Sequence, residues 1–128
     1  MEVLQRILVA ENNVPLRSLI EYTLTAAGCQ VFGVSTGRDA LRILRMERID
    51  LVVTDVCLPE LDGVELMMRL RADANKVPVI AISGGMSVLD DSSNLLEVAR
   101  LLGAVRTLQT PFSIDELIRA VKDTLSAQ

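Results

Sequence analysis

Short runs that are apolar at every position alternate along this chain with longer segments whose apolar residues recur at helical spacing. A continuously apolar run is typical of a strand buried on both faces of a sheet, whereas a half-exposed strand alternates. We expect strands at residues 7–10, 31–34, 51–53, 79–82 and 105–108, the third ending at Thr54 and Asp55 and the last being the weakest.

Helical patterns fill the gaps between these strands. Helices are expected at residues 15–27, 64–70 and about 92–102. Two more are expected to begin after a cap, one after Thr36 or Ser35 and one after Ser113. Ser113 and Glu116 form the capping-box pattern that opens a helix. Strands that alternate with helices predict βα units and a parallel sheet, so the fold class is α/β.

Chain length and net charge limit the classes of protein to which this sequence can belong. A chain of 128 residues has the size of one domain, and we expect a single domain over residues 1–128 with no output domain. Its net charge of −4 argues against a nucleic-acid partner, which would favour a basic face. Arg38, Arg42 and Arg45 on the second helix are interpreted as a solvated face.

The number of cysteines and the hydropathy of the chain give no indication of secretion or of membrane insertion. Cys29 and Cys57 are too few for a disulfide framework and are expected to be reduced thiols. The longest uncharged stretch, 77–89, is shorter than a membrane span requires, and no signal segment is visible. We therefore expect a cytoplasmic protein that does not contact a membrane.

Polar residues follow the apolar runs. Glu11 and Asn12 come after the first, Asp55 after the third, Ser83 after the fourth and Thr110 after the fifth. The carboxyl ends of parallel strands meet at one edge, where open α/β sheets bind ligands. Two carboxylates, an amide and two hydroxyls suit Mg²⁺, and a carboxylate beside a metal can act as a nucleophile. These residues could instead cap helices or line solvent.

The motifs, taken in order, resemble those of bacterial response-regulator receiver domains. Residues 7–12 are similar to the family's first strand and acidic pair, and residues 51–63 look like its phospho-acceptor segment, an Asp followed by a Pro-x-x-Asp-Gly loop. Ser83 stands at the family's Thr or Ser position, and residues 110–112 look like its Lys-Pro-Phe. Together with Gly103–Ala104, the resemblance covers essentially the whole chain. It implies a flavodoxin-like, doubly wound sheet of five strands with five helices.

The resemblance also implies roles for the site residues. Asp55 would accept a phosphoryl group, and Ser83 would hydrogen-bond to that group after transfer. Mg²⁺ would be held by the carboxylates of Glu11 and Asp55 and by the backbone carbonyl of Cys57, with Asn12 as a weak ligand or one acting through water. Such a domain signals and is not a classical enzyme, although it can catalyse its own phosphoryl transfer and dephosphorylation.

The sequence departs from the family pattern in four places. Asn12 replaces the second acid, and Thr110, in the third catalytic position, replaces the lysine. Thr107 stands where many members have an aromatic ring that changes rotamer on activation. The stretch from Ser83 to Gly103 is longer than usual.

The expected function is signalling in a phosphorelay. The partners would be a sensor histidine kinase or a histidine phosphotransfer protein, and a downstream protein bound around Leu101 and the last helix; a homodimer stays open. One alternative is a degenerate receiver that acts without phosphorylation. A flavin binder would need a different first loop and more aromatic residues. An aspartyl hydrolase would usually have an acid at the position of Cys57.

Overall fold

The computed structural model describes residues 3–83 and 92–128, and it contains strands and helices in strict alternation. The strands are β1 (Arg6–Ala10), β2 (Gln30–Val34), β3 (Leu51–Asp55), β4 (Val79–Ser83) and β5 (Arg106–Gln109). The helices are α1 (Val14–Ala26), α2 (Gly37–Met46), α3 (Gly63–Ala72), α4 (Ser92–Leu101) and α5 (Ile114–Ser126). The expected elements are confirmed, with ends that shift by one or a few residues.

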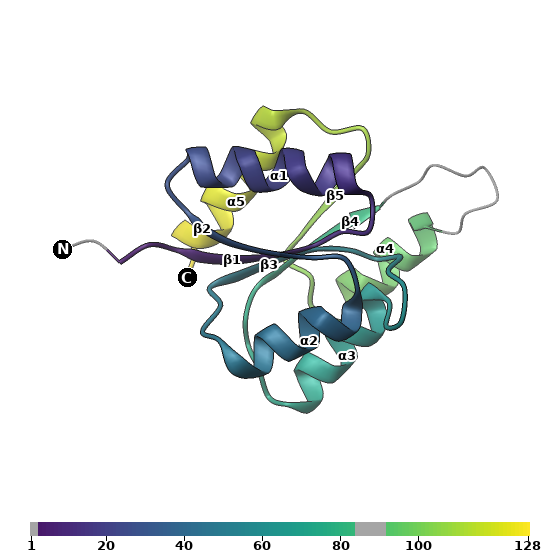
Figure 1. Ribbon diagram of the computed structural model, residues 1–128. Coiled ribbons are helices and arrows are strands. Elements are labelled where there is room, and N and C mark those ends of the chain that lie inside the picture. The colour runs from purple at the N-terminus through teal and green to yellow at the C-terminus, as the bar shows by residue number, and fades with distance from the viewer. Residues whose placement is uncertain (1–2, 84–91) are drawn as a thin grey trace.

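All five strands are parallel, in the order β2-β1-β3-β4-β5. Helices α1 and α5 cover one face of the sheet, and α2, α3 and α4 cover the other (Figure 1). The order reverses between β1 and β3, the point at which a doubly wound sheet opens a crevice at its carboxyl edge. The flavodoxin-like fold class expected from the sequence is therefore confirmed.

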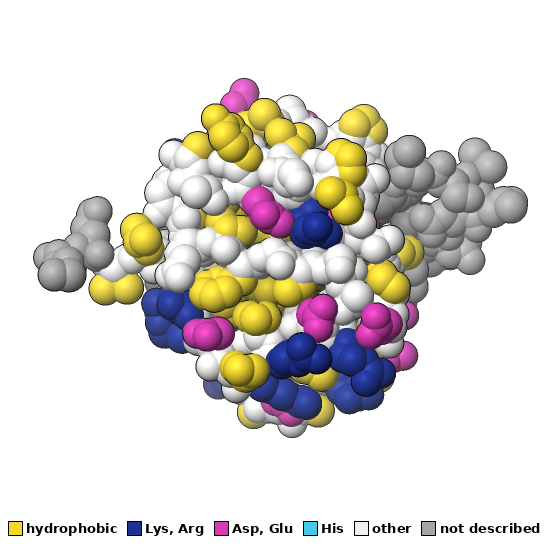
Figure 2. All heavy atoms as spheres, in the orientation of Figure 1, with side chains coloured by type: hydrophobic (Ala, Val, Ile, Leu, Met, Phe, Trp, Pro, Cys, Tyr) yellow, Lys and Arg dark blue, Asp and Glu magenta, His cyan; other side chains and the backbone are white. Residues whose placement is uncertain are grey.

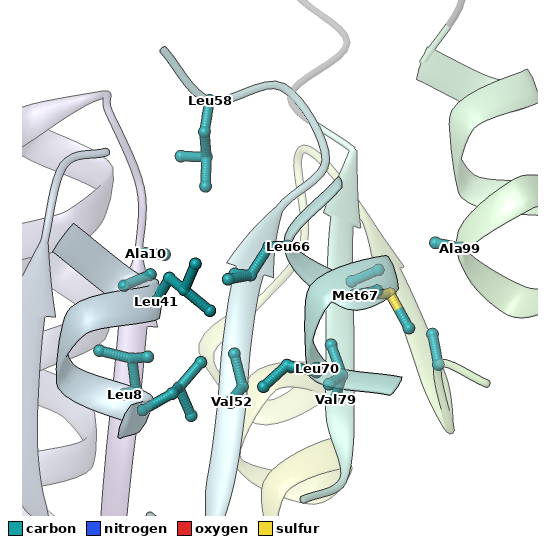
Figure 3. Close-up of a cluster of buried hydrophobic side chains, with 14 of the residues drawn as sticks. Leu8, Ala10, Leu41, Val52, Leu58, Leu66, Met67, Leu70, Val79 and Ala99 are labelled. Carbon is teal, nitrogen blue, oxygen red and sulfur yellow. The ribbon is translucent and has the colours of Figure 1, made fainter. Parts of the chain in front are cut away.

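The sheet separates two apolar cores, because successive strand residues point to opposite faces. In β1, Ile7 and Val9 pack beneath α1 and α5, whereas Leu8 and Ala10 pack beneath α2 and α3. Figure 3 shows part of the second core, where Leu41, Leu66 and Leu70 lie over the sheet residues Leu8, Val52 and Val79. Burial on both faces explains the apolar runs of the central strands β1, β3 and β4, whereas the edge strands β2 and β5 are partly exposed and contain polar residues.

Side-chain caps fix where the helices begin. The Asn13 and Asp62 side chains accept hydrogen bonds from the backbone N–H groups of Leu16 and Glu65. Thr36, one of the two expected caps, accepts from Asp39 N. The predicted Ser113–Glu116 capping box is present. Each cap satisfies a backbone donor that has no partner within its helix.

No helix in the described part of the chain is long and apolar enough to cross a membrane.

Candidate functional site

The polar residues predicted from the ends of the strands meet at the carboxyl edge of the sheet. Asp55 is the last residue of β3 and Ser83 the last of β4, while Glu11 directly follows β1 and Thr110 directly follows β5. Ala10 is in register with Thr54, and Ser83 with Gln109. Glu11, Asp55 and Thr110 line one pocket at this edge, whereas Ser83 is fully buried at the end of β4 and does not line that pocket.

Glu11 and Asp55 form a buried pair of carboxyl groups, with residue exposures of 1% and 6%. The pKa of Glu11 is raised to about 8 by burial, by a side-chain hydrogen bond with Asp55 and by the negative charge of Asp55. Asn12 N–H donates to Glu11 Oε2 at 3.0 Å. Two carboxylates cannot both ionise cheaply in such a place unless a cation stands beside them.

The loop after β3 holds the carboxylate of Asp55 in position. Cys57 N–H donates to Asp55 Oδ1 at 2.9 Å. Gly63 N–H donates to the Val56 carbonyl at 3.0 Å, which folds the loop back over the end of the strand. A Cβ at Gly63 would overlap the backbone carbonyl of Asp55. Glycine is therefore required where the loop returns to the site.

Ser83 brings a buried hydroxyl without a hydrogen-bond partner among the described residues. Its residue exposure is 0%. Leaving a buried hydroxyl unpaired costs free energy, so nearly all such groups have partners. Within the described part of the chain, the hydroxyl of Ser83 is thus a buried polar group whose hydrogen bond is still to be made.

Thr110 lies at the position of the family's lysine, and its hydroxyl makes a hydrogen bond to the protein backbone. Thr110 Oγ1 donates to the Ser83 backbone carbonyl at 2.8 Å, and Thr110 N–H donates to the same oxygen at 3.2 Å. The following Thr110–Pro111 peptide bond is cis. This position therefore has a hydroxyl where the family has an ammonium group. The hydroxyl links the loop after β5 to the end of β4.

A pocket of about 510 Å³ opens beside Asp55. Its polar part comprises Glu11, Asn12, Asn13, Asp55, Cys57 and Thr110, and its apolar part comprises Leu16, Leu19, Pro111 and Phe112. The apolar residues come from the first turns of α1 and from the loop before α5. Leu16 and Leu19 were not expected at the site, although their spacing of three residues places them on one helix face.

Asn12 and Thr107, two positions at which the sequence departs from the family pattern, lie in different surroundings. Asn12 is exposed at the rim of the pocket, and the expected role as a weak ligand stays a prediction. Thr107 Oγ1 accepts a hydrogen bond of 3.1 Å from Arg100, so an arginine of α4 contacts the position of the family's aromatic ring. Gly84–Gly85, at the start of the lengthened stretch, lie outside the described residues.

The donor set fits a hard cation. In the described part of the chain, His, Cys, Asp and Glu side chains do not gather in groups of three or more that could hold a metal. The two buried carboxyl groups of Glu11 and Asp55 match a cation that prefers oxygen and retains water ligands, as Mg²⁺ does.

Comparisons with known proteins agree with this geometry. The family model described as response regulator receiver domain matches residues 7–122. Sporulation initiation phosphotransferase F of Bacillus subtilis is 31% identical over 123 residues, covering 94% of each chain. The receiver domain of Francisella response regulator 1452 has a TM-score of 0.83 at 29% identity, covering 96% of this chain and 98% of that one.

A further solved structure is the receiver domain of sensor histidine kinase PA1611 from Pseudomonas aeruginosa, described with a magnesium ion coordinated in its active-site cleft. It has a TM-score of 0.83 at 30% identity and covers 97% of this chain and 99% of its own.

This chain belongs to the response regulator receiver domain family. It is a receiver domain of two-component signalling, a class that binds Mg²⁺ in its active site and interacts with histidine kinases or phosphotransfer proteins and with downstream targets. The flavin-binder and hydrolase alternatives are set aside by this membership, and the degenerate-receiver alternative is not favoured.

Proposed function

We propose that Asp55 accepts a phosphoryl group from the phosphohistidine of a sensor histidine kinase or a histidine phosphotransfer protein. The observation that carries the proposal is the buried Glu11–Asp55 pair, next to the strand that ends in Ser83, whose hydroxyl has no partner among the described residues. The acidic pair and the pocket would supply a nucleophile and a place for a cation, and the Ser83 hydroxyl would supply a donor for the arriving oxygens.

In the transfer, a carboxylate oxygen of Asp55 forms a bond to phosphorus while the phosphorus–nitrogen bond of the donor breaks. The bonding pair stays with the imidazole nitrogen, and the product is an acyl phosphate on Asp55. Such transfers depend on positioning and on charge neutralisation. The hydrogen bond from Cys57 N–H supplies the positioning by fixing the plane of the carboxylate.

We propose that Glu11, Asp55 and the backbone carbonyl of Cys57 would hold Mg²⁺, with Asn12 contributing weakly or through water. The ion would supply positive charge against the oxygens of the phosphoryl group. Glu11 takes part only as a carboxylate, so its raised pKa makes proton release part of cation binding. Here the family's lysine is absent, and residues 84–91 contain no Lys or Arg that could replace it.

The hydroxyl of Ser83 would donate to a phosphoryl oxygen after transfer. Thr110 would act on the phosphoryl group through Ser83, because its hydroxyl donates to the Ser83 carbonyl. The phosphodonor would enter over Leu16, Leu19 and Phe112, which form the apolar side of the pocket next to Asp55.

Output would pass to a protein bound around Leu101 and α5. Leu101 is 79% exposed, whereas Ala99, two residues earlier, is buried. Arg100 joins this part of α4 to β5 through its hydrogen bond to Thr107. A structural change at the end of β4 would be transmitted to the exposed side of α4 through the Arg100–Thr107 hydrogen bond.

The test is phosphorylation by acetyl phosphate in the presence of Mg²⁺, measured by intact mass. The natural chain and Asp123→Asn, an exposed α5 control, are expected to gain one phosphoryl group, and Asp55→Asn none. Phosphorylation that persists in Asp55→Asn would point to another acceptor. Its absence from the natural chain, with either acetyl phosphate or a phosphorylated phosphotransfer protein, would favour the degenerate receiver.

A further inference from the structure

A second hollow, separate from the acidic site, lies between α2 and α3 and has a volume of about 520 Å³. Four arginines line it: Arg38, Arg42 and Arg45 from α2 and Arg69 from α3. Figure 2 shows Lys and Arg side chains gathered over the part of the molecule that Figure 1 assigns to α2 and α3, next to hydrophobic side chains. This clustering is unexpected in a chain whose net charge is −4.

Arg38 and Arg42 are only weakly engaged by carboxylates, whereas Arg45 makes two hydrogen bonds to Asp73, at 2.9 and 3.3 Å. The Arg38–Glu60 and Arg42–Asp39 pairs have N···O distances of 3.5 and 3.4 Å, and all four of their side chains are exposed. Ion pairs in water contribute little and exchange readily. Arg69 makes no ion pair with a carboxylate in the parts of the chain that the structure describes. The guanidinium groups of Arg38, Arg42 and Arg69 can therefore be taken over by the carboxylates of another molecule.

Between the arginines the hollow is apolar. Leu41 and Leu61 are at most 9% exposed and lie at its base, whereas Met46, also in the lining, is 71% exposed. Met side chains adapt to irregular partners because they are unbranched and flexible. The hollow thus combines an apolar base with a charged rim, the arrangement that protein–protein interfaces use.

We propose that this α2–α3 hollow docks an acidic segment of a partner protein, with an apolar side chain of that segment seated against Leu41 and Leu61. The planar fork of arginine matches a carboxylate, and Arg38, Arg42 and Arg69 present such forks around the hollow beside the Arg45–Asp73 pair. A nucleic acid fits less well, because its phosphate backbone offers no apolar side chain for the base of the hollow. The proposal goes beyond the phospho-acceptor function and does not depend on it.

The hollow is connected to the loop that follows Asp55. Glu60 and Leu61 belong to that loop, and Glu60 pairs with Arg38. Gly37 N–H, at the start of α2, donates to the Pro59 carbonyl at 3.3 Å. A partner seated in the α2–α3 hollow would therefore contact the segment that carries the carbonyl of Cys57.

The experiment measures fluorescence anisotropy with a labelled helical peptide of glutamate and alanine that carries leucines at helical spacing. Two matched peptides replace either every leucine by serine or every glutamate by lysine. The double variant R42E/R69E is compared with R106E/R119E, which changes the net charge equally at two exposed arginines of β5 and α5. Circular dichroism verifies that both variants fold.

We expect the leucine–glutamate peptide to bind the natural chain, and R42E/R69E to weaken binding by about tenfold or more while R106E/R119E changes it by less than about twofold. The serine and lysine peptides should bind at least about tenfold more weakly to the natural chain. Equal losses in the two double variants would overturn the proposal, because binding would then follow overall charge. Equal affinity for the serine peptide, or no binding to the natural chain, would also overturn it.

Discussion

The hydroxyl of Thr110 donates a 2.8 Å hydrogen bond to the backbone carbonyl of Ser83, the residue whose own hydroxyl has no partner among the described residues. The loop after β5 is thereby fastened to the end of β4 at the acidic site. A lysine at this position would project a charge into the site, whereas threonine stiffens its wall.

Replacing Thr110 by valine should remove this hydrogen bond while keeping the shape of the side chain. We expect the free energy of unfolding to fall by about 1 kcal/mol, the usual contribution of one such bond. Thr110→Ser retains the hydroxyl and is the control. Urea unfolding of the three proteins measures the difference, and equal stability of the valine and natural chains would show that the bond contributes nothing.

Restoring the lysine should strengthen the response to a phosphoryl mimic. A ligand shifts a conformational equilibrium only through its different affinities for the two states. Thr110→Lys, ideally combined with Asn12→Asp, adds a charged contact to the phosphoryl oxygens. Amide exchange in α4, with and without beryllofluoride and Mg²⁺, should change little in the natural chain and more in the variant. An equally large change in the natural chain would contradict this prediction.

The raised pKa of Glu11 predicts how stability depends on pH without a divalent cation. The pKa is about 8 in the folded chain against 4.5 for an unperturbed glutamate, so between these values the folded state binds more protons than the unfolded state. Stability should therefore decrease as pH rises from about 5 to 8. Urea unfolding in EDTA should detect this slope, and Glu11→Gln should flatten it. An unchanged slope in Glu11→Gln would assign the effect to other groups.

Mg²⁺ should bind weakly, because the site has two carboxylates and no second acid at Asn12. We expect a dissociation constant in the millimolar range, about −4 kcal/mol of binding free energy. Asn12→Asp should tighten binding. Asn13→Asp is a matched control, since it adds the same charge one residue further on, where aspartate can still cap α1. Calorimetric titration that found equal gains for both variants would indicate a long-range charge effect in place of a new ligand.

The strand ends allowed much of the site to be predicted from the sequence. Apolar runs mark strands, and Glu11, Asp55 and Ser83 follow such runs, so parallel pairing alone places them at the carboxyl ends of neighbouring strands. The sequence shows which residues can carry a charge, but it does not show how deeply each one is buried or which groups it contacts. The raised pKa of Glu11 depends on its burial and on its contact with Asp55, which is distant in the sequence, and no local pattern encodes either.

Other features depended on packing between elements distant in sequence. The Arg38, Arg42 and Arg45 series predicted a solvated face, and these side chains are exposed as expected. Arg69 joins them only because α3 packs beside α2. Likewise, the bond from Thr110 to the Ser83 carbonyl joins residues 27 positions apart in the chain. Tertiary geometry created both the second hollow and the wall of the acidic site.

The placement of helices on two sides of the sheet has a consequence for assembly. The pocket beside Asp55 is walled by α1 and the loop before α5, whereas the α2–α3 hollow belongs to the opposite layer. A phosphodonor over the first and an acidic segment in the second would not compete for the same surface. A ternary complex could then form in either order of addition, and each occupant could remain bound while the other exchanges.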